Sequence, residues 1–240
     1  MTSWPIRSLL AVVGAVALLA PTTVTAQAQP SAGRLTECSQ THTLDDPRFG
    51  PRVLPKRGVV GEQLVGYRRT GKLTPRRFLE TYYDSAANGG QGSWRYPPAD
   101  GYLLSPEGTP VIIPTRLAPG RLLDRYGSEY GQFLAPKGSS YASRSIPPQS
   151  LVSTPAAYCN YRAYEVLRPF VVDSGPIAPW FAQPGGGWQY QLKAAHIPGA
   201  PSPLNVKWLL DNGFLKRIIG PPQTRAERDL PTFDRALSFG

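Results

Sequence analysis

The sequence contains very few of the side chains that bind metal ions. Among its 240 residues, histidine occurs only at His42 and His196, and cysteine only at Cys38 and Cys159. Neither histidine has a partner at metal-ligand spacing, so the sequence gives little support to metal chemistry. The Gly-x-Ser-x-Gly motif is absent, and both cysteines are better used in a disulfide than as nucleophiles. A metalloenzyme and a serine or cysteine hydrolase are therefore disfavoured.

Long apolar runs are missing after the first 28 residues. The start of the chain has the pattern of a secretory signal: Arg7, an apolar run over Leu9–Ala20, and Ala26-Gln27-Ala28 as a small-x-small cleavage site. We expect a signal peptide over residues 1–28, which leaves 240 − 28 = 212 residues of a secreted, extracellular protein. An uncleaved membrane anchor is the alternative, although the apolar run is short for a membrane span.

Acidic residues are fewer than basic ones. The chain has 16 Asp and Glu against 26 Lys and Arg, a formal net charge of +10. A basic surface favours anionic partners such as phosphorylated nucleotides, nucleic acids and anionic cell envelopes. A generally solvated basic surface explains the same excess equally well.

The two cysteines are expected to pair, because an exported chain folds in an oxidising environment. A Cys38–Cys159 disulfide would tie the N-terminal arm to the core. In the chain-entropy model, a loop of about 120 residues gives about 4 to 5 kcal/mol of stabilisation.

Residues 29–93 read as an N-terminal arm with little periodicity. A short helix is expected near residues 75–83, because Thr74 is a good N-cap and Pro75 suits the first helical position. A further helical turn is expected within Glu62–Arg69, ended by Gly71. Asp84–Ser93 is rich in glycine and is expected to be a loop.

The core, residues 94–220, has short segments rich in β-branched and aromatic residues, separated by proline and glycine. The expected strands are Val111–Ile113, Arg121–Tyr126, Tyr161–Val172 and Gly187–Leu192. We predict an α+β fold, a β-rich single domain with a central antiparallel sheet and few short helices.

Two details of this core are open to test. The residues from Tyr161 alternate without a purely apolar face, which is typical of a strand that borders a groove or lies at a sheet edge. A helix is expected from the cap Asn205 to the stop signal Gly213. Residues 221–240 form a charged, proline-containing C-terminal tail.

Two stretches, residues 124–136 and residues 178–190, gather glycine, proline and aromatic side chains around one planar polar group. Glycine lets the backbone approach a ligand, and aromatic faces stack on flat rings. In the first stretch Arg125 offers a fork of donors that suits phosphate. In the second, Gln189 offers a neutral donor and acceptor. A groove with both side chains would suit a nucleotide.

Together with Tyr96-Pro97-Pro98-Ala99-Asp100-Gly101, these stretches resemble the tuberculosis necrotizing toxin (TNT) domain family, which includes bacterial toxin domains and fungal surface enzymes that hydrolyse NAD. The resemblance covers roughly residues 94–220. Its three motifs occur in order: Tyr-Pro-Pro-x-Asp-Gly, Asp-Arg-Tyr-Gly, and Pro-Trp-Phe-x-Gln-Pro-Gly-Gly-Gly-x-Gln-Tyr. It implies a hydrolase that cleaves NAD, and also NADP, at the nicotinamide–ribose bond. NAD is then the substrate, and neither a cofactor nor a metal is implied.

The resemblance gives Gln189 a catalytic role beside the ribose, and Arg125 is assigned to the pyrophosphate because its fork of donors can bind it bidentately. The alternatives are a structural salt bridge of Arg125 with Asp124 or another acid, and a surface or hydrogen-bonded core position for Gln189. The other expected substrate-binding residues are two ring side chains after Arg125 and three residues before Gln189: Tyr126, Phe133, Trp180, Gln183 and Gly187. Core packing is the alternative for Tyr126, Phe133 and Trp180.

Three other functions remain open: a non-catalytic secreted module that binds anionic ligands, an ADP-ribosyltransferase, and a paired-carboxylate glycosidase. For the last, acids are available at Asp100, Glu129, Glu165 and Asp173, but no spacing singles out two of them. The expected partners are NAD and NADP, and an immunity protein if the chain is a toxin. Neither nucleic acid nor, after signal cleavage, a membrane is expected.

Overall fold

A computed structural model describes Met1, residues 37–154 and residues 156–219 of the chain. Apart from Met1, the predicted signal peptide and the predicted C-terminal tail lie outside these residues. Within them, no helix has the length and apolar character needed to cross a bilayer.

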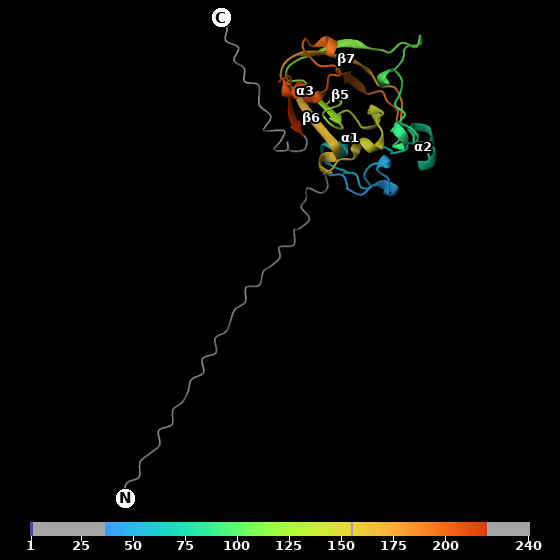
Figure 1. Ribbon diagram of the computed structural model, residues 1–240, viewed down its shortest axis with the longest axis vertical. Helices are drawn as coiled ribbons and strands as arrows, with labels where there is room; N and C mark the ends of the chain where they lie inside the picture. The colour runs from blue at the N-terminus through green and yellow to red at the C-terminus, as the bar shows by residue number, and fades with distance from the viewer. Residues whose placement is uncertain (2–36, 155, 220–240) are drawn as a thin grey trace. The chain divides into compact units, whose positions relative to one another are not determined.

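The described core is built on one antiparallel sheet of seven strands, in the order β3-β7-β8-β5-β4-β6-β9 (Figure 1). The strands are β3 (Ile113–Leu117), β4 (Leu122–Tyr126), β5 (Phe133–Pro136), β6 (Tyr161–Val166), β7 (Phe170–Pro176), β8 (Trp188–Gln191) and β9 (Leu215–Ile219). A separate short pair joins β1 (Tyr83–Asp84) to β2 (Ser93–Trp94). The predicted β-rich α+β fold with a central antiparallel sheet is confirmed.

The described helices are few and short. The α-helices are α1 (Gly58–Gln63), α2 (Pro75–Tyr82) and α3 (Val206–Asp211). The 3-10 turns are η2 (Thr43–Asp45), η3 (Pro47–Phe49), η4 (Asn88–Gly90), η5 (Ala99–Gly101), η6 (Ala142–Arg144), η7 (Pro148–Leu151), η8 (Ala157–Asn160) and η9 (Ala194–His196).

The caps predicted for α2 and α3 are present. The Thr74 hydroxyl accepts a hydrogen bond from the Arg77 backbone N–H at 3.3 Å, and Pro75 begins α2. The Asn205 side chain accepts from the Trp208 N–H at 2.9 Å. The caps satisfy donors that a helix start leaves open, so both starts could be predicted locally.

One prediction in the N-terminal arm is wrong, and another differs from the structure only at its ends. The helical turn expected over Glu62–Arg69 is misplaced, because α1 runs over Gly58–Gln63 and shares only its last two residues with that range. Gly66, with φ +74°, could not continue a right-handed helix. The loop expected over Asp84–Ser93 is present over residues 85–92, and only its two end residues pair, in strands β1 and β2.

The single strand expected over Tyr161–Val172 is also wrong. The backbone N–H groups of Leu167 and Arg168 donate to the Phe214 carbonyl, and Pro169 has no N–H, so β6 and β7 are separate strands. Neither β5 nor β9 was predicted.

Strand β6 lies between β4 and β9 rather than at an edge of the sheet, which contradicts that alternative. Its register shifts between Ala163 and Tyr164, and both side chains are fully buried. A bulge of this kind places successive side chains in packed surroundings, which explains why neither face of the sequence looked apolar.

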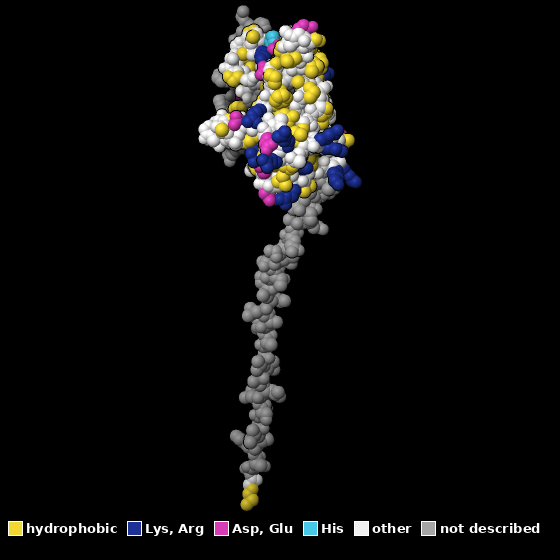
Figure 2. All heavy atoms as spheres, turned by 90° about the vertical axis from the view of Figure 1, so that its right-hand side faces the viewer, with side chains coloured by type: hydrophobic (Ala, Val, Ile, Leu, Met, Phe, Trp, Pro, Cys, Tyr) yellow, Lys and Arg dark blue, Asp and Glu magenta, His cyan; other side chains and the backbone are white. Residues whose placement is uncertain are grey.

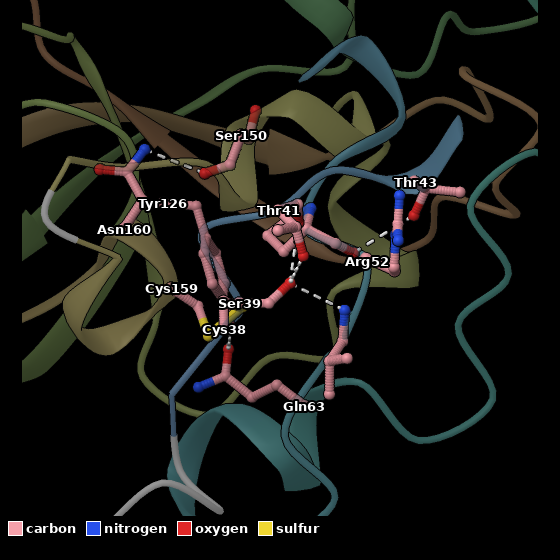
Figure 3. Close-up of a disulfide and its surroundings, with 12 residues drawn as sticks. Cys38, Ser39, Thr41, Thr43, Arg52, Gln63, Tyr126, Ser150, Cys159 and Asn160 are labelled. Atoms are coloured by element: carbon pink, nitrogen blue, oxygen red, sulfur yellow. Dashed lines mark hydrogen bonds between the residues drawn. A yellow bond between two sulfur atoms is a disulfide. The ribbon is translucent and has the colours of Figure 1, made fainter. Parts of the chain in front are cut away.

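The disulfide between Cys38 and Cys159 is present, with the two Cα atoms 5.0 Å apart (Figure 3). Both cysteines are buried, in a cluster with Val60, Tyr126 and Tyr161. The described part of the arm therefore packs directly on the sheet, and the predicted pairing is confirmed.

A second cluster joins the arm to the loop after β7. Phe78 of α2 and Phe181 are fully buried, and the Tyr82 ring lies 5.4 Å from the Phe181 ring, centre to centre. On the face shown in Figure 2, Lys and Arg side chains lie mainly over the lower half of the folded body, with some Asp and Glu side chains among them.

Candidate active site

A pocket of about 510 Å³ opens beside β4, β5 and β8, a size typical of small-molecule sites. It is lined by Tyr96, Pro97, Asp100, Gly101, Asp124, Arg125, Tyr126, Gly127, Phe133, Leu134, Ala135, Arg144, Ser145, Ile146, Pro147, Ser150, Ile177 and Gln189. Residues from all three sequence motifs thus meet around one cavity, although they are up to 93 positions apart in the chain (189 − 96).

Arg125 reaches this pocket from β4. Its Nη1 donates to the Phe133 carbonyl at 3.0 Å, while its Nε is buried without a hydrogen-bond partner in the described part of the chain. The turn after β4 makes room for the guanidinium, because a Cβ at Gly131 would overlap it. The close packing holds the side chain in one place.

No acid pairs with Arg125 among residues 37–154 and 156–219, so the expected alternative of a bridge to Asp124 is not found. Burial lowers the pKa of the Arg125 guanidinium and the nearby cation Arg162 acts in the same direction, whereas Tyr164 and Glu129 act in the opposite direction. An arginine keeps its proton even so, because its ordinary pKa lies far above neutral. A half-buried cation without a salt-bridge partner is stabilised when an anion binds.

Asp124 is instead paired with Arg144, which the sequence did not indicate. Arg144 Nη1 lies 2.7 Å from Asp124 Oδ1, and both side chains are buried. The other carboxylate oxygen accepts hydrogen bonds from the Tyr161 hydroxyl and the Gly138 N–H, each at 2.9 Å. The stretch that holds Arg144, Ser145 and the following residues of the pocket wall has no motif, so no local signal could have found it.

Gln189 projects from β8 and is 8% exposed. Its Nε2 donates to the Asp100 carbonyl oxygen at 3.1 Å, and no hydrogen bond occupies its Oε1 within the described residues. The Asp100 carboxylate accepts from Gln191 Nε2 at 2.8 Å and lies 3.5 Å from Lys193 Nζ. The first and third motifs are thus joined, and one amide atom of Gln189 remains available to a ligand.

Two predicted ring side chains line the pocket in different ways. Phe133 is 37% exposed and forms part of the rim, whereas Tyr126 is buried in the wall. Burial raises the pKa of the Tyr126 phenol above its ordinary value, so the hydroxyl remains a neutral donor. It donates to Gln63 Oε1 at 3.1 Å.

Three other predicted residues lie outside the lining. Trp180 Nε1 donates to the Arg95 carbonyl and Gln183 Nε2 to the Arg68 carbonyl, each at 2.7 Å. A Cβ at Gly187 would lie 2.6 Å from the Ser143 carbonyl oxygen. These contacts give the three residues structural roles, and their part in substrate binding stays a prediction.

The four acids considered for a glycosidase do not gather at the pocket, because only Asp100 lines it. Glu129 accepts from Arg217 Nε at 2.7 Å and from the Tyr164 hydroxyl at 3.2 Å. Asp173 lies 2.7 Å from His196 Nε2. Glu165 also lies outside the lining, so the structure does not assemble two of these four acids there. Within the described residues, no group of three or more His, Cys, Asp or Glu could hold a metal ion.

Residues 116–218 match the family model described as tuberculosis necrotizing toxin. Over 190 residues, the chain is 42% identical to the conidial surface nicotinamide adenine dinucleotide glycohydrolase of Aspergillus fumigatus, with 79% of this chain and 76% of that protein covered. Among solved structures, that of tuberculosis necrotizing toxin complexed with its immunity factor has a TM-score of 0.45 and 22% identity, covering 60% of this chain and 71% of the other. The family match includes Arg125 and Gln189, which meet in the pocket. From the family match and the 42% identity together, the chain belongs to the tuberculosis necrotizing toxin domain family.

Proposed function

We propose that this protein is an NAD glycohydrolase, which cleaves NAD, and also NADP, into nicotinamide and ADP-ribose or its phosphorylated form. The observation that carries the proposal is that Arg125 and Gln189 line one pocket in a chain 42% identical to a nicotinamide adenine dinucleotide glycohydrolase. The dinucleotide is the substrate, and the proposal requires no cofactor.

Cleavage of the nicotinamide–ribose bond needs little general acid or base catalysis. Nicotinamide leaves from a pyridinium, so its nitrogen takes the bonding electron pair and departs neutral without a general acid. Water adds its oxygen to the ribose carbon and releases a proton. The transition state resembles an oxocarbenium ion, so the protein's main task is to bind both ends of the substrate and place polar groups beside the ribose.

Arg125 is proposed to bind the pyrophosphate. Its half-buried guanidinium forms no salt bridge with an acid among the described residues, and a bidentate phosphate contact would supply a negative charge within hydrogen-bond distance. Repulsion from Arg162 would also be offset by the bound anion.

Gln189 is proposed to bind the ribose. Its Nε2 is held by the Asp100 carbonyl, which leaves Oε1 to accept a hydrogen bond from a ribose hydroxyl. Tyr126 and Phe133 would wall the slot, and Trp180, Gln183 and Gly187 would support it through the loop that precedes β8.

We further propose that the protein acts outside the cell that makes it. The signal pattern of residues 1–28 supports this, and the fungal relative is named as a conidial surface protein. If the protein acts as a toxin, its producer needs a protective partner such as an immunity protein.

NAD consumption by the purified, oxidised chain in the presence of a chelator tests the proposal. Arg125→Ala should lower kcat/KM by roughly 10²-fold or more, because a charge-assisted phosphate contact is lost. Arg116→Ala is the matched control: it removes the same charge from an exposed position on β3, outside the pocket, and should leave turnover unchanged. A folded, disulfide-bonded chain without turnover would refute the enzyme and favour a binding module.

A further inference from the structure

The pocket wall is supported by a residue that lies outside the lining and outside residues 116–218. Gln63, the last residue of α1, is 3% exposed, and its Oε1 accepts two hydrogen bonds. The donors are Tyr126 Oη and Arg144 Nη2, each at 3.1 Å. Both donor residues line the pocket and Gln63 does not. Figure 3 shows Gln63 pointing at Tyr126 close to the Cys38–Cys159 disulfide.

The chemistry of Arg144 decides which way the Gln63 amide faces. A guanidinium only donates hydrogen bonds, so the oxygen of the amide has to face it. The Nε2 of Gln63 is buried without a hydrogen bond of normal geometry in the described part of the chain. Burial raises the pKa of the Tyr161 phenol, and the Gln63 side chain acts on it in the opposite direction. The hydrogen bonds of the Gln63 side chain to Tyr126 and Arg144 are therefore made by its oxygen.

Gln63, Tyr126 and Arg144 form one packed unit. The Gln63 carbonyl accepts from the Tyr141 N–H at 2.7 Å, directly before η6, which carries Arg144. The Tyr141 ring lies 4.9 Å from the Tyr126 ring, and the Arg144 guanidinium carbon lies 5.3 Å from the centre of the Tyr126 ring. A change in the Gln63 side chain would therefore alter the positions of both Tyr126 and Arg144 in the pocket wall.

We infer that Gln63 is a positioning residue, which fixes the Tyr126 hydroxyl and the Arg144 guanidinium at the pocket wall and makes the N-terminal segment a required part of the active site. The inference rests on the proposed function for its effect on rate. It gives residues 37–93 a role in catalysis through the pocket wall, without contact between Gln63 and the substrate.

Two substitutions in the full chain test it. Gln63→Met keeps the length of the side chain but removes the acceptor, and should lower kcat/KM for NAD about tenfold or more, because small misplacements of a site cost that much. Gln63→Glu keeps an oxygen at the same place in either protonation state, so it should recover most of the lost activity. If Gln63 merely filled space, Gln63→Met and Gln63→Glu would both keep the native kcat/KM.

Val60→Ala is the control for stability. Val60 is buried on the same helix and in the same cluster, but has no hydrogen bond to the pocket wall. It should lower the melting temperature with kcat/KM unchanged. The inference is overturned if Gln63→Met keeps full kcat/KM. It is also overturned if Gln63→Met and Val60→Ala both lose kcat/KM in proportion to their loss of stability.

Crystal structures of the native and Gln63→Met chains separate this inference from the proposed function. A shift of the Tyr126 hydroxyl or the Arg144 guanidinium in the variant is expected whether or not the chain hydrolyses NAD. Unchanged positions of both groups would overturn the inference. A native chain without turnover would count against the proposed function alone.

Discussion

Two arginines line the same pocket but differ in their electrostatic surroundings. Arg144 lies 2.7 Å from Asp124, and the buried pair is held further by Tyr161. Arg125 has a carbonyl as its hydrogen-bond partner and no acid among the described residues. Because an ion pair satisfies its own charge, Arg144 is suited to hold the wall, and Arg125 is suited to attract an anionic ligand.

At the same scale, Gln189→Ala should lower kcat roughly 10²- to 10³-fold while NAD still binds, because a polar contact beside the developing charge is lost. The measurement is kcat from NAD turnover, with the affinity for NAD taken from calorimetry on the same variant. Gln91→Ala, an exposed change in the β1–β2 hairpin, serves as the matched control. Unchanged kcat in Gln189→Ala would remove Gln189 from the mechanism.

At the scale of elements, the turn between β4 and β5 decides where Arg125 lies. Gly131 has no strained φ, but a Cβ there would overlap the Arg125 guanidinium. The obstacle is the end of a flexible side chain, so the backbone can accept the extra methyl group if Arg125 moves.

Gly131→Ala should therefore displace the Arg125 guanidinium and lower NAD turnover roughly 10²-fold, with little loss of stability. Turnover and thermal unfolding are measured side by side. Ser128→Ala, an exposed position in the same turn, should change neither quantity. Full activity in Gly131→Ala would mean that the position of Arg125 does not limit the reaction.

At the scale of the whole described fold, the disulfide and the aromatic cluster around Phe78 attach the N-terminal segment to the sheet. Cys38 and Cys159 are 121 positions apart, and the bond lies in the same cluster as Tyr126. Stability and the shape of the pocket wall are therefore coupled through this segment.

Replacing both cysteines by serine should lower the free energy of unfolding by about 4 kcal/mol, because the unfolded chain regains the entropy of a large open loop. Denaturant unfolding measures this difference, and the native chain under reductant should lose a similar amount. Equal unfolding midpoints for the double variant and the oxidised native chain would contradict the expected contribution of the bond.

Part of this fold could be predicted from local features of the sequence and from features that occur only once in it. The caps Thr74 and Asn205 act within three residues of their partners, so the starts of α2 and α3 followed from the sequence. The disulfide followed because the chain has only two cysteines. The three ordered motifs likewise pointed to Arg125, Tyr126, Phe133 and Gln189, all of which line the pocket.

Contacts between distant residues were decided only by the tertiary structure. Asp124 pairs with Arg144 rather than its neighbour Arg125, and Gln63 reaches the pocket wall from 63 positions before Tyr126. Burial and hydrogen bonding across the fold determine such pairs, and no periodicity within either segment encodes them. The sequence by itself therefore determined the family motifs, the two capped helix starts and the cysteine pairing. The folded chain determined that, of the two arginines in the pocket, Arg144 has an acid partner and Arg125 forms no salt bridge among the described residues.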